Sequence, residues 1–149
     1  MSDFAQLPQY ANEVLQKMSA GQRAKLSNTI GRELRNSQKQ RITAQQNPDG
    51  SSYTPRKKRL RERMKGKVRS KMFSKIKALT YLKIMTNENS INIGFAGRVA
   101  RMARVHQYGL RDRADKNGPM VQYPKRELLG LTQQEITKIT NLLEQHISA

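Results

Sequence analysis

The chain has 149 residues, of which 36% are apolar and 5% aromatic, and it contains no Cys and no Trp. A chain of this length typically forms one domain, but this composition leaves little apolar surface to bury. We therefore expect partners or self-association to supply part of the burial that the core lacks. The lack of Cys excludes disulfides, thiolate metal sites and cysteine catalysis.

The formal charge of +18 arises from 29 Lys and Arg against 11 Asp and Glu. Such an excess attracts a polyanion or an acidic protein surface. No apolar run reaches the roughly 18 residues of a membrane-spanning helix, and the first residues lack the charged and then apolar pattern of a signal sequence. The sequence therefore predicts a soluble protein that is made in the cytoplasm and has no membrane partner.

The N-terminal third is predicted to be helical. Residues 3–18 are expected to form an amphipathic helix, because apolar residues recur at helical spacing. These are Leu7, Tyr10, Ala11, Val14 and Met18. A second helix is expected to begin at a capping box formed by Ser19 and Gln22. It is expected to end near Gln46, before the Asn-Pro-Asp-Gly turn at residues 47–50 and a loop at residues 51–55.

Residues 56–77 carry most of the charge. They contain twelve Lys and Arg and one Glu, so 12 − 1 = +11 of the +18 lies in this basic arm. Apolar residues recur at every fourth position from Leu60 to Ile76, which predicts a helical portion around Met64 to Lys77. Because like charges four residues apart oppose a helix, we expect an extended basic arm that becomes ordered on assembly.

The pattern changes after the basic arm. Residues 79–86 are rich in β-formers, residues 87–89 suit a turn and residues 91–95 alternate in polarity, so a β-hairpin is expected. A short helix over residues 98–107 is expected to end at Gly109 in the left-handed conformation. Residues 112–119 are expected to form an exposed loop, and residues 121–123 a short edge strand.

The last helix has the clearest boundaries. Thr132 and Glu135 match a capping box, and Leu131 and Ile136 match a hydrophobic staple. Its apolar face consists of Ile136, Ile139, Leu143 and Ile147. Together these elements predict an α+β fold in a single domain over residues 1–149. It comprises N-terminal helices, a small antiparallel sheet built on the hairpin, a C-terminal helix and the extended basic arm.

The sequence contains no catalytic constellation. His106 and His146 are the only histidines, and they lie far apart without metal-ligand spacing, so His106 is expected to be a hydrogen-bonded structural residue. The sequence also lacks a phosphate-binding glycine loop, a nucleophile elbow and paired carboxylates. We therefore expect no enzymatic activity, no metal and no cofactor.

The basic arm leaves two interpretations open. Ten of the sixteen residues 56–71 are basic, which suits non-specific contacts with nucleic-acid phosphates. Aromatic residues for base stacking are nearly absent, with Tyr53 and Phe73 the nearest, so sequence-specific reading of single strands is not expected. In the other interpretation, the arm docks on an acidic protein surface or lines a channel through which DNA passes.

Four short segments follow one another in a characteristic order and spacing. They are residues 47–50 with 53–57, residues 91–95, residues 105–109, and residues 123–130 with the helix that follows. Together they resemble the phage virion morphogenesis family, the tail completion proteins of contractile-tailed temperate bacteriophages. The resemblance runs from about residue 20 to the end of the chain. Two features depart from the family pattern: Tyr53 stands where Trp is common, and the basic arm is more basic.

The resemblance implies a small α+β protein without catalytic activity that acts late in virion assembly, at the junction of head and tail. It implies a ring homo-oligomer at the head-proximal end of the tail, with the tail tube, terminator or connector proteins as partners and DNA passing through the channel. It further implies a location in the host cytoplasm during assembly and in the tail or neck of the mature virion. The alternative is a non-specific nucleic-acid-binding protein that is similar in charge and size to small ribosomal or nucleoid proteins.

Nine residues are expected to lie at an interface or to face DNA. They are Tyr53, Arg59, Arg61, Arg63, Lys65, Lys67, His106, Tyr108 and Arg126. Tyr53 offers a rigid amphipathic anchor beside the turn at residues 47–50. Arg126 is expected to form an ion pair with a carboxylate, while Leu128 and Leu129 pack into the core.

Overall fold

The computed structural model describes residues 17–56, 71–87, 90–113 and 116–148. The helix predicted over residues 3–18 and most of the basic arm therefore lie outside the described residues. The elements, in chain order, are α2 (Ala20–Thr43), β1 (Leu82–Thr86), β2 (Ile91–Phe95), a 3-10 turn (Gly97–Val99), α4 (Ala100–Tyr108), β3 (Arg111–Arg113), β4 (Met120–Gln122) and α5 (Gln133–Ser148). The predicted α+β class is confirmed.

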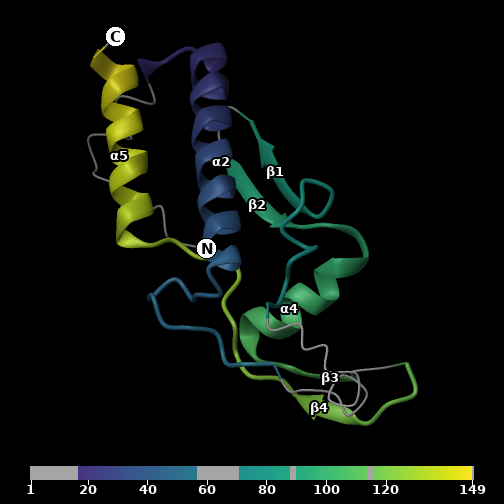
Figure 1. The fold of residues 1–149 in the computed structure, drawn as a ribbon. Coiled ribbons are helices and arrows are strands. Elements are labelled where there is room, and N and C mark those ends of the chain that lie inside the picture. Colours follow the sequence, from purple (N-terminus) through teal and green to yellow (C-terminus); the bar gives the residue numbers. More distant parts are fainter. Residues whose placement is uncertain (1–16, 57–70, 88–89, 114–115, 149) are drawn as a thin grey trace.

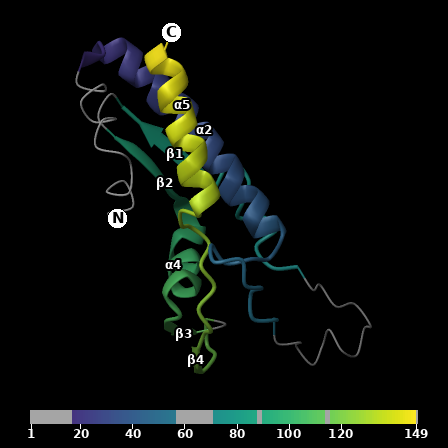
Figure 2. The same ribbon diagram turned by 90° about the vertical axis from the view of Figure 1, so that its left-hand side faces the viewer.

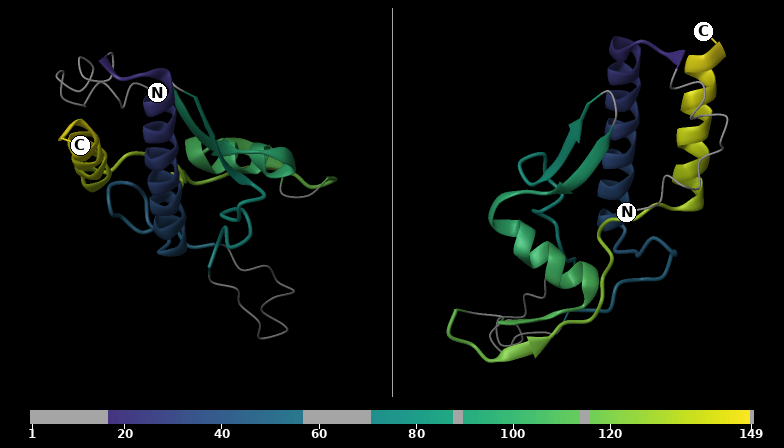
Figure 3. Two further views of the ribbon diagram at one scale, coloured as in Figure 1. Left: turned by 90° about the horizontal axis from the view of Figure 1, so that it is seen from above. Right: turned by 180° about the vertical axis from the view of Figure 1, so that it is seen from behind.

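Helix α2 is the central element of the described chain. Figure 1 shows α5 along one side of α2 and the β1–β2 hairpin along another, and the opposite view in Figure 3 shows the same order. Helix α4 and the β3–β4 hairpin lie at the far end of the molecule, beyond the C-terminal end of α2 (Figure 2). The structure therefore has a helical part, formed by α2, α5 and the β1–β2 hairpin, and a smaller part formed by α4, β3 and β4.

The start of α2 follows its capping signal. Ser19 Oγ accepts a hydrogen bond from the Gln22 backbone N–H at 3.2 Å, and Gln22 Oε1 accepts one from the Ser19 backbone N–H at 3.1 Å. This confirms the predicted capping box. The helix ends at Thr43, earlier than the predicted Gln46, because Gln45 adopts a left-handed conformation with φ +58°.

Two hydrophobic clusters form the core. The first joins α2 to α5 and consists of Leu26, Ile30, Leu34, Ile139 and Leu143. The second lies at the C-terminal end of α2 and consists of Ile42, Tyr53, Ile76, Ala103 and Leu128. Because the second cluster draws on five separate chain segments, it ties the α4–β3–β4 part to the helical part.

The β1–β2 hairpin has the predicted antiparallel pairing, with Ile84 opposite Ile93. It packs closely on α2 at Gly31, where an added Cβ would lie 3.1 Å from Cγ2 of Thr86. The first strand begins at Leu82 and not at Leu79, because residues 79–81 form a turn and Leu79 remains exposed. The hairpin prediction is confirmed with a shorter first strand.

The predicted helix around residues 64–77 is wrong for residues 71–77, of which 71–73 are irregular and 74–77 form a turn. Residues 64–70 lie outside the described residues. Phe73 has φ +64°, which interrupts a helix. The Met72 backbone N–H donates to Gln45 Oε1 and its carbonyl accepts from Gln45 Nε2, both at 2.8 Å. Tertiary contacts thus hold this end of the basic arm and allow Ile76 to enter the second cluster.

The loop predicted over residues 112–119 is wrong at its start, because Asp112 and Arg113 belong to strand β3. This strand pairs antiparallel with β4, with Asp112 opposite Val121. Both carboxylate oxygens of Asp112 accept hydrogen bonds from Arg101, at 2.6 and 3.1 Å. This bidentate ion pair fixes the second hairpin against α4. Strand β4 begins at Met120, one residue before the predicted edge strand.

The ends of the last two helices agree with their sequence signals. Helix α4 is followed by Gly109 in the left-handed conformation, with φ +62°. Before α5, the Glu135 backbone N–H donates to Thr132 Oγ1 at 3.1 Å and the Thr132 backbone N–H donates to Glu135 Oε2 at 2.8 Å. Both predictions are confirmed. None of the helices in the described ranges is long and apolar enough to cross a bilayer.

Candidate functional site: the clasped segment

Residues 126–130 form an extended segment between β4 and α5, which we call the clasped segment. All five of its backbone N–H groups donate hydrogen bonds, and four of its five carbonyl oxygens accept them. Eight of these nine bonds are made with side chains from other parts of the chain. A segment without strand neighbours thereby satisfies its buried backbone groups.

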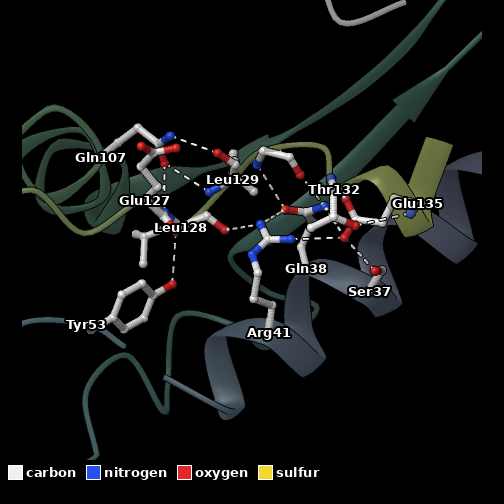
Figure 4. Close-up of polar contacts among 11 residues, drawn as sticks. Ser37, Gln38, Arg41, Tyr53, Gln107, Glu127, Leu128, Leu129, Thr132 and Glu135 are labelled. Carbon is white, nitrogen blue, oxygen red and sulfur yellow. Dashed lines mark hydrogen bonds and ion pairs between the residues drawn. The ribbon is translucent and has the colours of Figure 1, made fainter. Parts of the chain in front are cut away.

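Helix α2 supplies two of the clasping side chains. Gln38 Nε2 donates to the Gly130 carbonyl at 3.0 Å, while Gln38 Oε1 accepts from the Gly130 N–H at 3.1 Å. Arg41 Nη2 donates to the Leu128 carbonyl at 3.2 Å and also to Gln38 Oε1. Figure 4 shows both side chains pointing from α2 toward the clasped segment.

Glu135 links this arrangement to α5. Its Oε1 accepts hydrogen bonds from Ser37 Oγ at 2.6 Å, from Arg41 Nη1 at 2.9 Å and from Gln38 Nε2 at 3.3 Å. The Arg41–Glu135 ion pair is buried, with side-chain exposures of 8% and 6%. A buried ion pair is tolerated when further hydrogen bonds satisfy both partners, as they do here for the carboxylate. Glu135 therefore caps α5 and neutralises Arg41 at once.

Three further side chains hold the middle of the clasped segment. Gln107 Oε1 accepts from the Leu128 and Leu129 N–H groups, each at 2.9 Å, and Gln107 Nε2 donates to the Leu129 carbonyl at 2.8 Å. Asn47 Oδ1 accepts from the Glu127 N–H at 2.8 Å. The Tyr53 hydroxyl donates to the Glu127 carbonyl at 3.0 Å. Helix α4 and the turn after α2 are thus fastened to the same five residues.

Gly130 completes the arrangement by its lack of a side chain. An added Cβ would lie 2.6 Å from Cγ of Pro48. Contacts this short do not occur in proteins, so the ring of Pro48 requires glycine at this position. The turn at residues 47–50 therefore packs directly on the end of the clasped segment.

Arg126 is buried without a carboxylate partner among the described residues. Its Nε donates to the Thr54 carbonyl at 2.9 Å and its Nη2 to the Pro55 carbonyl at 3.3 Å, while Nη1 lies 3.1 Å from His106 Nδ1. None of the described carboxylates therefore forms the predicted ion pair with Arg126. Two backbone carbonyls and an imidazole nitrogen solvate the guanidinium instead. These contacts also hold residues 54–55, which lead into the basic arm, against the clasped segment.

The contact with Arg126 determines the protonation state of His106. Because guanidinium groups only donate, Nδ1 of His106 accepts and the ring proton lies on Nε2. Burial, with a smaller contribution from the charge of Arg126, lowers the pKa of His106 to about 4. The imidazole is therefore neutral at pH 7. Burial also raises the pKa of Tyr53 to about 12, so its hydroxyl remains a donor.

Four aromatic rings form a row beneath the clasped segment. Ring centroids lie 5.7 Å apart for Tyr53 and Phe73, 4.8 Å for Phe73 and His106, and 5.1 Å for His106 and Tyr123, each pair edge to face. Edge-to-face pairs of this kind contribute beyond their buried area. Phe73 lies in the C-terminal part of the basic arm, so this row holds that end of the arm, while Arg126 holds the residues just before its first end.

The chemistry of the site favours positioning and not reaction. In the part of the chain that the structure describes, no three His, Asp or Glu side chains gather as metal ligands. Glu135 is occupied by Arg41, and the imidazole of His106 faces a guanidinium. The arrangement rigidly connects α2, α4, α5 and the two ends of the basic arm.

Three of the four segments that carry the sequence resemblance meet here. Asn47, Pro48 and Tyr53 come from the first, Gln107 and His106 from the third, and the clasped segment itself from the fourth. Residues 91–95 do not take part, because they form strand β2 on α2. The order and spacing of the segments thus correspond to one connected structural feature.

The predicted interface residues lie in different environments. Tyr53, His106 and Arg126 are interior, with 4%, 9% and 4% of their surface exposed, whereas Tyr108 is 62% exposed at the end of α4. The remaining five, Arg59, Arg61, Arg63, Lys65 and Lys67, lie outside the described residues. Interface or DNA contact by these residues stays a prediction, and the three buried residues act within the fold as positioning groups.

Sequence reasoning missed Gln38 and Arg41. The signal was present, because Leu26, Ile30, Leu34 and Ile42 form an apolar row at every fourth position and Gln38 interrupts it. A polar residue within a buried row must be hydrogen-bonded. Its partner, Gly130, gave no corresponding signal.

The profile of the phage virion morphogenesis family matches residues 2–148. A curated relative, tail completion protein S of Escherichia phage P2, is 31% identical over 148 residues, which cover 99% of each chain. No solved structure gives a significant match. A profile match over residues 2–148 and 31% identity over 99% of both chains show that the protein belongs to the phage virion morphogenesis family.

Proposed function

We propose that the protein is a non-enzymatic virion assembly factor that completes the phage tail and takes part in head–tail joining. The observation that carries the proposal is the similarity to a tail completion protein over 99% of both chains. The clasped segment supports it, because the site connects elements and presents no reactive group free for catalysis. On this proposal residues 1–149 act as a single tail-completion domain, in the host cytoplasm during assembly and in the virion tail or neck afterwards.

The proposed assembly is a ring at the head-proximal end of the tail. Exposed apolar side chains occur at separate places: Leu79 and Met85 on or before β1, and Tyr108, Leu110 and Met120 around α4, β3 and β4. A ring of identical copies is built from head-to-tail contacts between two different surfaces. Two distinct apolar surfaces on one chain suit that requirement. The tail tube, terminator or connector is the proposed partner beyond the ring.

Complementation tests the function. A phage that lacks its own tail completion gene is expected to regain infectious particles when this chain is supplied, and electron microscopy is expected to show tails joined to heads. Persistent separate heads and tails, with soluble protein present, would reject the proposal.

Light scattering separates the ring from the alternative of a nucleic-acid-binding protein. A closed oligomer that persists at high salt without DNA supports a joining ring. A monomer that grows only on duplex DNA and dissociates as salt rises supports the alternative. A matched variant replaces Arg59, Arg61, Arg63 and Lys65 with Gln. Failed joining by a folded variant supports tail completion, whereas lost DNA binding with normal joining supports the alternative.

A further inference from the structure

Helix α2 has an exposed side that nothing in the described structure covers. One side packs on α5 through Leu26, Ile30 and Leu34, and a second side meets the β1–β2 hairpin at Gly31. Figures 1 and 3 show α2 between α5 and the β1–β2 hairpin, which leaves a third side of the helix exposed. Its exposed residues are Lys25, Arg32, Asn36, Lys39, Gln40 and Thr43, which we call the α2 track.

The cations of the α2 track are regularly spaced. Lys25, Arg32 and Lys39 follow one another at seven-residue intervals. Seven residues are close to two helical turns, so the three side chains leave the same side of α2 at steps of about 10 Å. The neutral side chains of Asn36, Gln40 and Thr43 are hydrogen-bonding groups. The track is therefore a straight row of positive charges with polar groups among them.

No carboxylate interrupts the α2 track among the described residues. Glu33 is the acidic residue of α2. It lies at the edge of the track, seven residues before Gln40, and Lys138 of α5 pairs with its carboxylate at 2.7 Å. At the C-terminal end, Lys77 Nζ donates to Thr43 Oγ1 at 2.8 Å. This lysine extends the row beyond the helix toward the base of the basic arm. An ordinary solvated helix face carries both signs of charge, and this one carries a single sign.

The composition of the α2 track fits phosphate better than a protein surface. Protein contacts depend on buried aromatic and apolar anchors, and the track has none. The molecule's large exposed apolar side chains, such as Met85 and Tyr108, lie on other elements. A second copy is also a poor complement, because four of its six described carboxylates, those of Glu33, Asp112, Glu127 and Glu135, each pair with a cation of their own chain.

We propose that the α2 track binds the phosphate backbone of duplex DNA without reading its sequence. Lys25, Arg32 and Lys39 each neutralise a phosphate, and the side-chain amides of Asn36 and Gln40 donate hydrogen bonds to phosphate oxygens. The track has no aromatic side chain for base stacking, so neither single strands nor particular sequences are favoured. The inference rests on the proposed function in that a joining ring lies where phage DNA passes.

The test measures the binding of the full-length protein to a labelled 20-base-pair duplex across a range of NaCl concentrations. The track variant is K25Q/R32Q/K39Q. The matched control, K83Q/R104Q/K116Q, removes three exposed cations from β1, α4 and the loop before β4. Each lost phosphate contact reduces the slope of log K against log salt by about 0.9. We expect the track variant to lose about 2.7 of slope and on the order of a hundredfold in affinity at 0.1 M salt, and the control to lose much less.

Equal losses of affinity and slope in the two triple variants would show that binding depends only on the total charge of the protein. An unchanged slope in the track variant would show that α2 does not contact DNA. Either result overturns the inference. A track variant that binds DNA normally but no longer binds purified tails also overturns the inference, because that result would show that α2 contacts an acidic protein of the tail. If the triple variant does not fold, R32Q alone is expected to lower the slope by about 0.9.

Complementation by the wild-type chain keeps the two proposals separate. Failure to complement, with the slope change present, rejects tail completion and leaves the α2 track as a DNA-binding face. Successful complementation with no slope change rejects the track alone.

Discussion

Gln38 and Gly130 are separated by 92 residues in the sequence, yet the side-chain amide of Gln38 forms two hydrogen bonds with the backbone N–H and C=O of Gly130, at 3.1 and 3.0 Å. The side chain pairs with the backbone as a neighbouring β-strand does. Because Gln38 is buried in α2, this contact joins the long helix to the segment that leads into α5. The position of α5 thus depends on one amide as well as on apolar packing.

Replacing Gln38 with Ala is expected to lower the free energy of unfolding by about 2–4 kcal/mol. Four hydrogen bonds are lost, two with Gly130 and one each with Arg41 and Glu135. The buried N–H and C=O of Gly130 are left unpaired, which costs more than the bonds themselves contribute. Urea unfolding followed by circular dichroism measures the change. The control is Gln40→Ala, two residues away on the exposed side of α2, which is expected to change stability by less than about 0.5 kcal/mol. Equal effects would show that the clasp does not stabilise the fold.

The buried pair of Arg41 and Glu135 leads to a second prediction. Arg41→Met leaves a buried carboxylate without its cation and is expected to cost about 3–5 kcal/mol. Adding Glu135→Gln removes that charge, so the double variant is expected to be more stable than Arg41→Met alone. The exposed pair Glu33 and Lys138 is the comparison, and Glu33→Gln is expected to cost less than about 1 kcal/mol. A double-mutant cycle by chemical denaturation measures all of these; additive losses at the buried pair would contradict the prediction.

The low pKa of His106 predicts a stability that depends on pH. Burial first, and Arg126 second, lower the pKa to about 4 in the folded protein, from about 6.5 in the unfolded chain. Between these two values the unfolded chain binds more protons than the folded protein. The free energy of unfolding is therefore highest above about pH 6.5 and falls as the pH decreases toward 4. The shift of the His106 pKa accounts for a total loss of about 3 kcal/mol in the free energy of unfolding.

Two variants test the assignment to His106. Unfolding measured from pH 7 to pH 4 is expected to show a much smaller pH-dependent loss in His106→Phe, which keeps an aromatic ring between Phe73 and Tyr123. The control His146→Gln changes an exposed histidine of α5 and is expected to keep the wild-type dependence. A wild-type dependence in His106→Phe would place the titrating group elsewhere.

The elements with local signals were predicted from the sequence, and those formed by distant contacts were not. The capping boxes at Ser19 and Thr132 and the turn between β1 and β2 consist of neighbouring residues, so they could be identified directly. Strand β3 was missed, because Asp112 is ordered by its pairing with Val121 of β4 and by Arg101, eleven residues away. The non-helical residues 71–77 were predicted as helix, since the apolar spacing contained no information on Gln45 or on the core that receives Ile76.

The site was predictable in its parts and not in its assembly. Residues 47–57, 105–109 and 123–130 were singled out by their resemblance to a family, but nothing in the sequence placed them together. Arg126 shows why: a basic residue near a surface ordinarily pairs with a carboxylate, and here backbone carbonyls of Thr54 and Pro55 take that place. Backbone partners cannot be recognised from residue types.

Gly130→Ala is expected to destabilise the protein by about 1–3 kcal/mol, because the new methyl group overlaps the ring of Pro48 and forces the turn or the clasped segment to move. Gly21→Ala is the control within the first turn of α2, where an added Cβ has no neighbour within 4 Å. That change is expected to stabilise by up to about 1 kcal/mol through better helix propensity. Thermal unfolding compares the two variants, and a neutral Gly130→Ala would show that the turn at residues 47–50 adjusts freely.

Two tyrosines with opposite exposure separate folding from assembly. Tyr53→Phe removes the hydroxyl that donates to the Glu127 carbonyl and is expected to cost about 1–2 kcal/mol, while the ring contact with Phe73 remains. Tyr108→Ser removes a ring that is 62% exposed, so the free energy of unfolding is expected to change by less than about 0.5 kcal/mol. If Tyr108 lies at an interface of the ring, this second variant alone lowers oligomer mass and phage yield. Normal assembly by Tyr108→Ser would remove Tyr108 from the proposed contacts. Leu110 and Met120 of the same surface, and Leu79 and Met85 of the other, would then be tested.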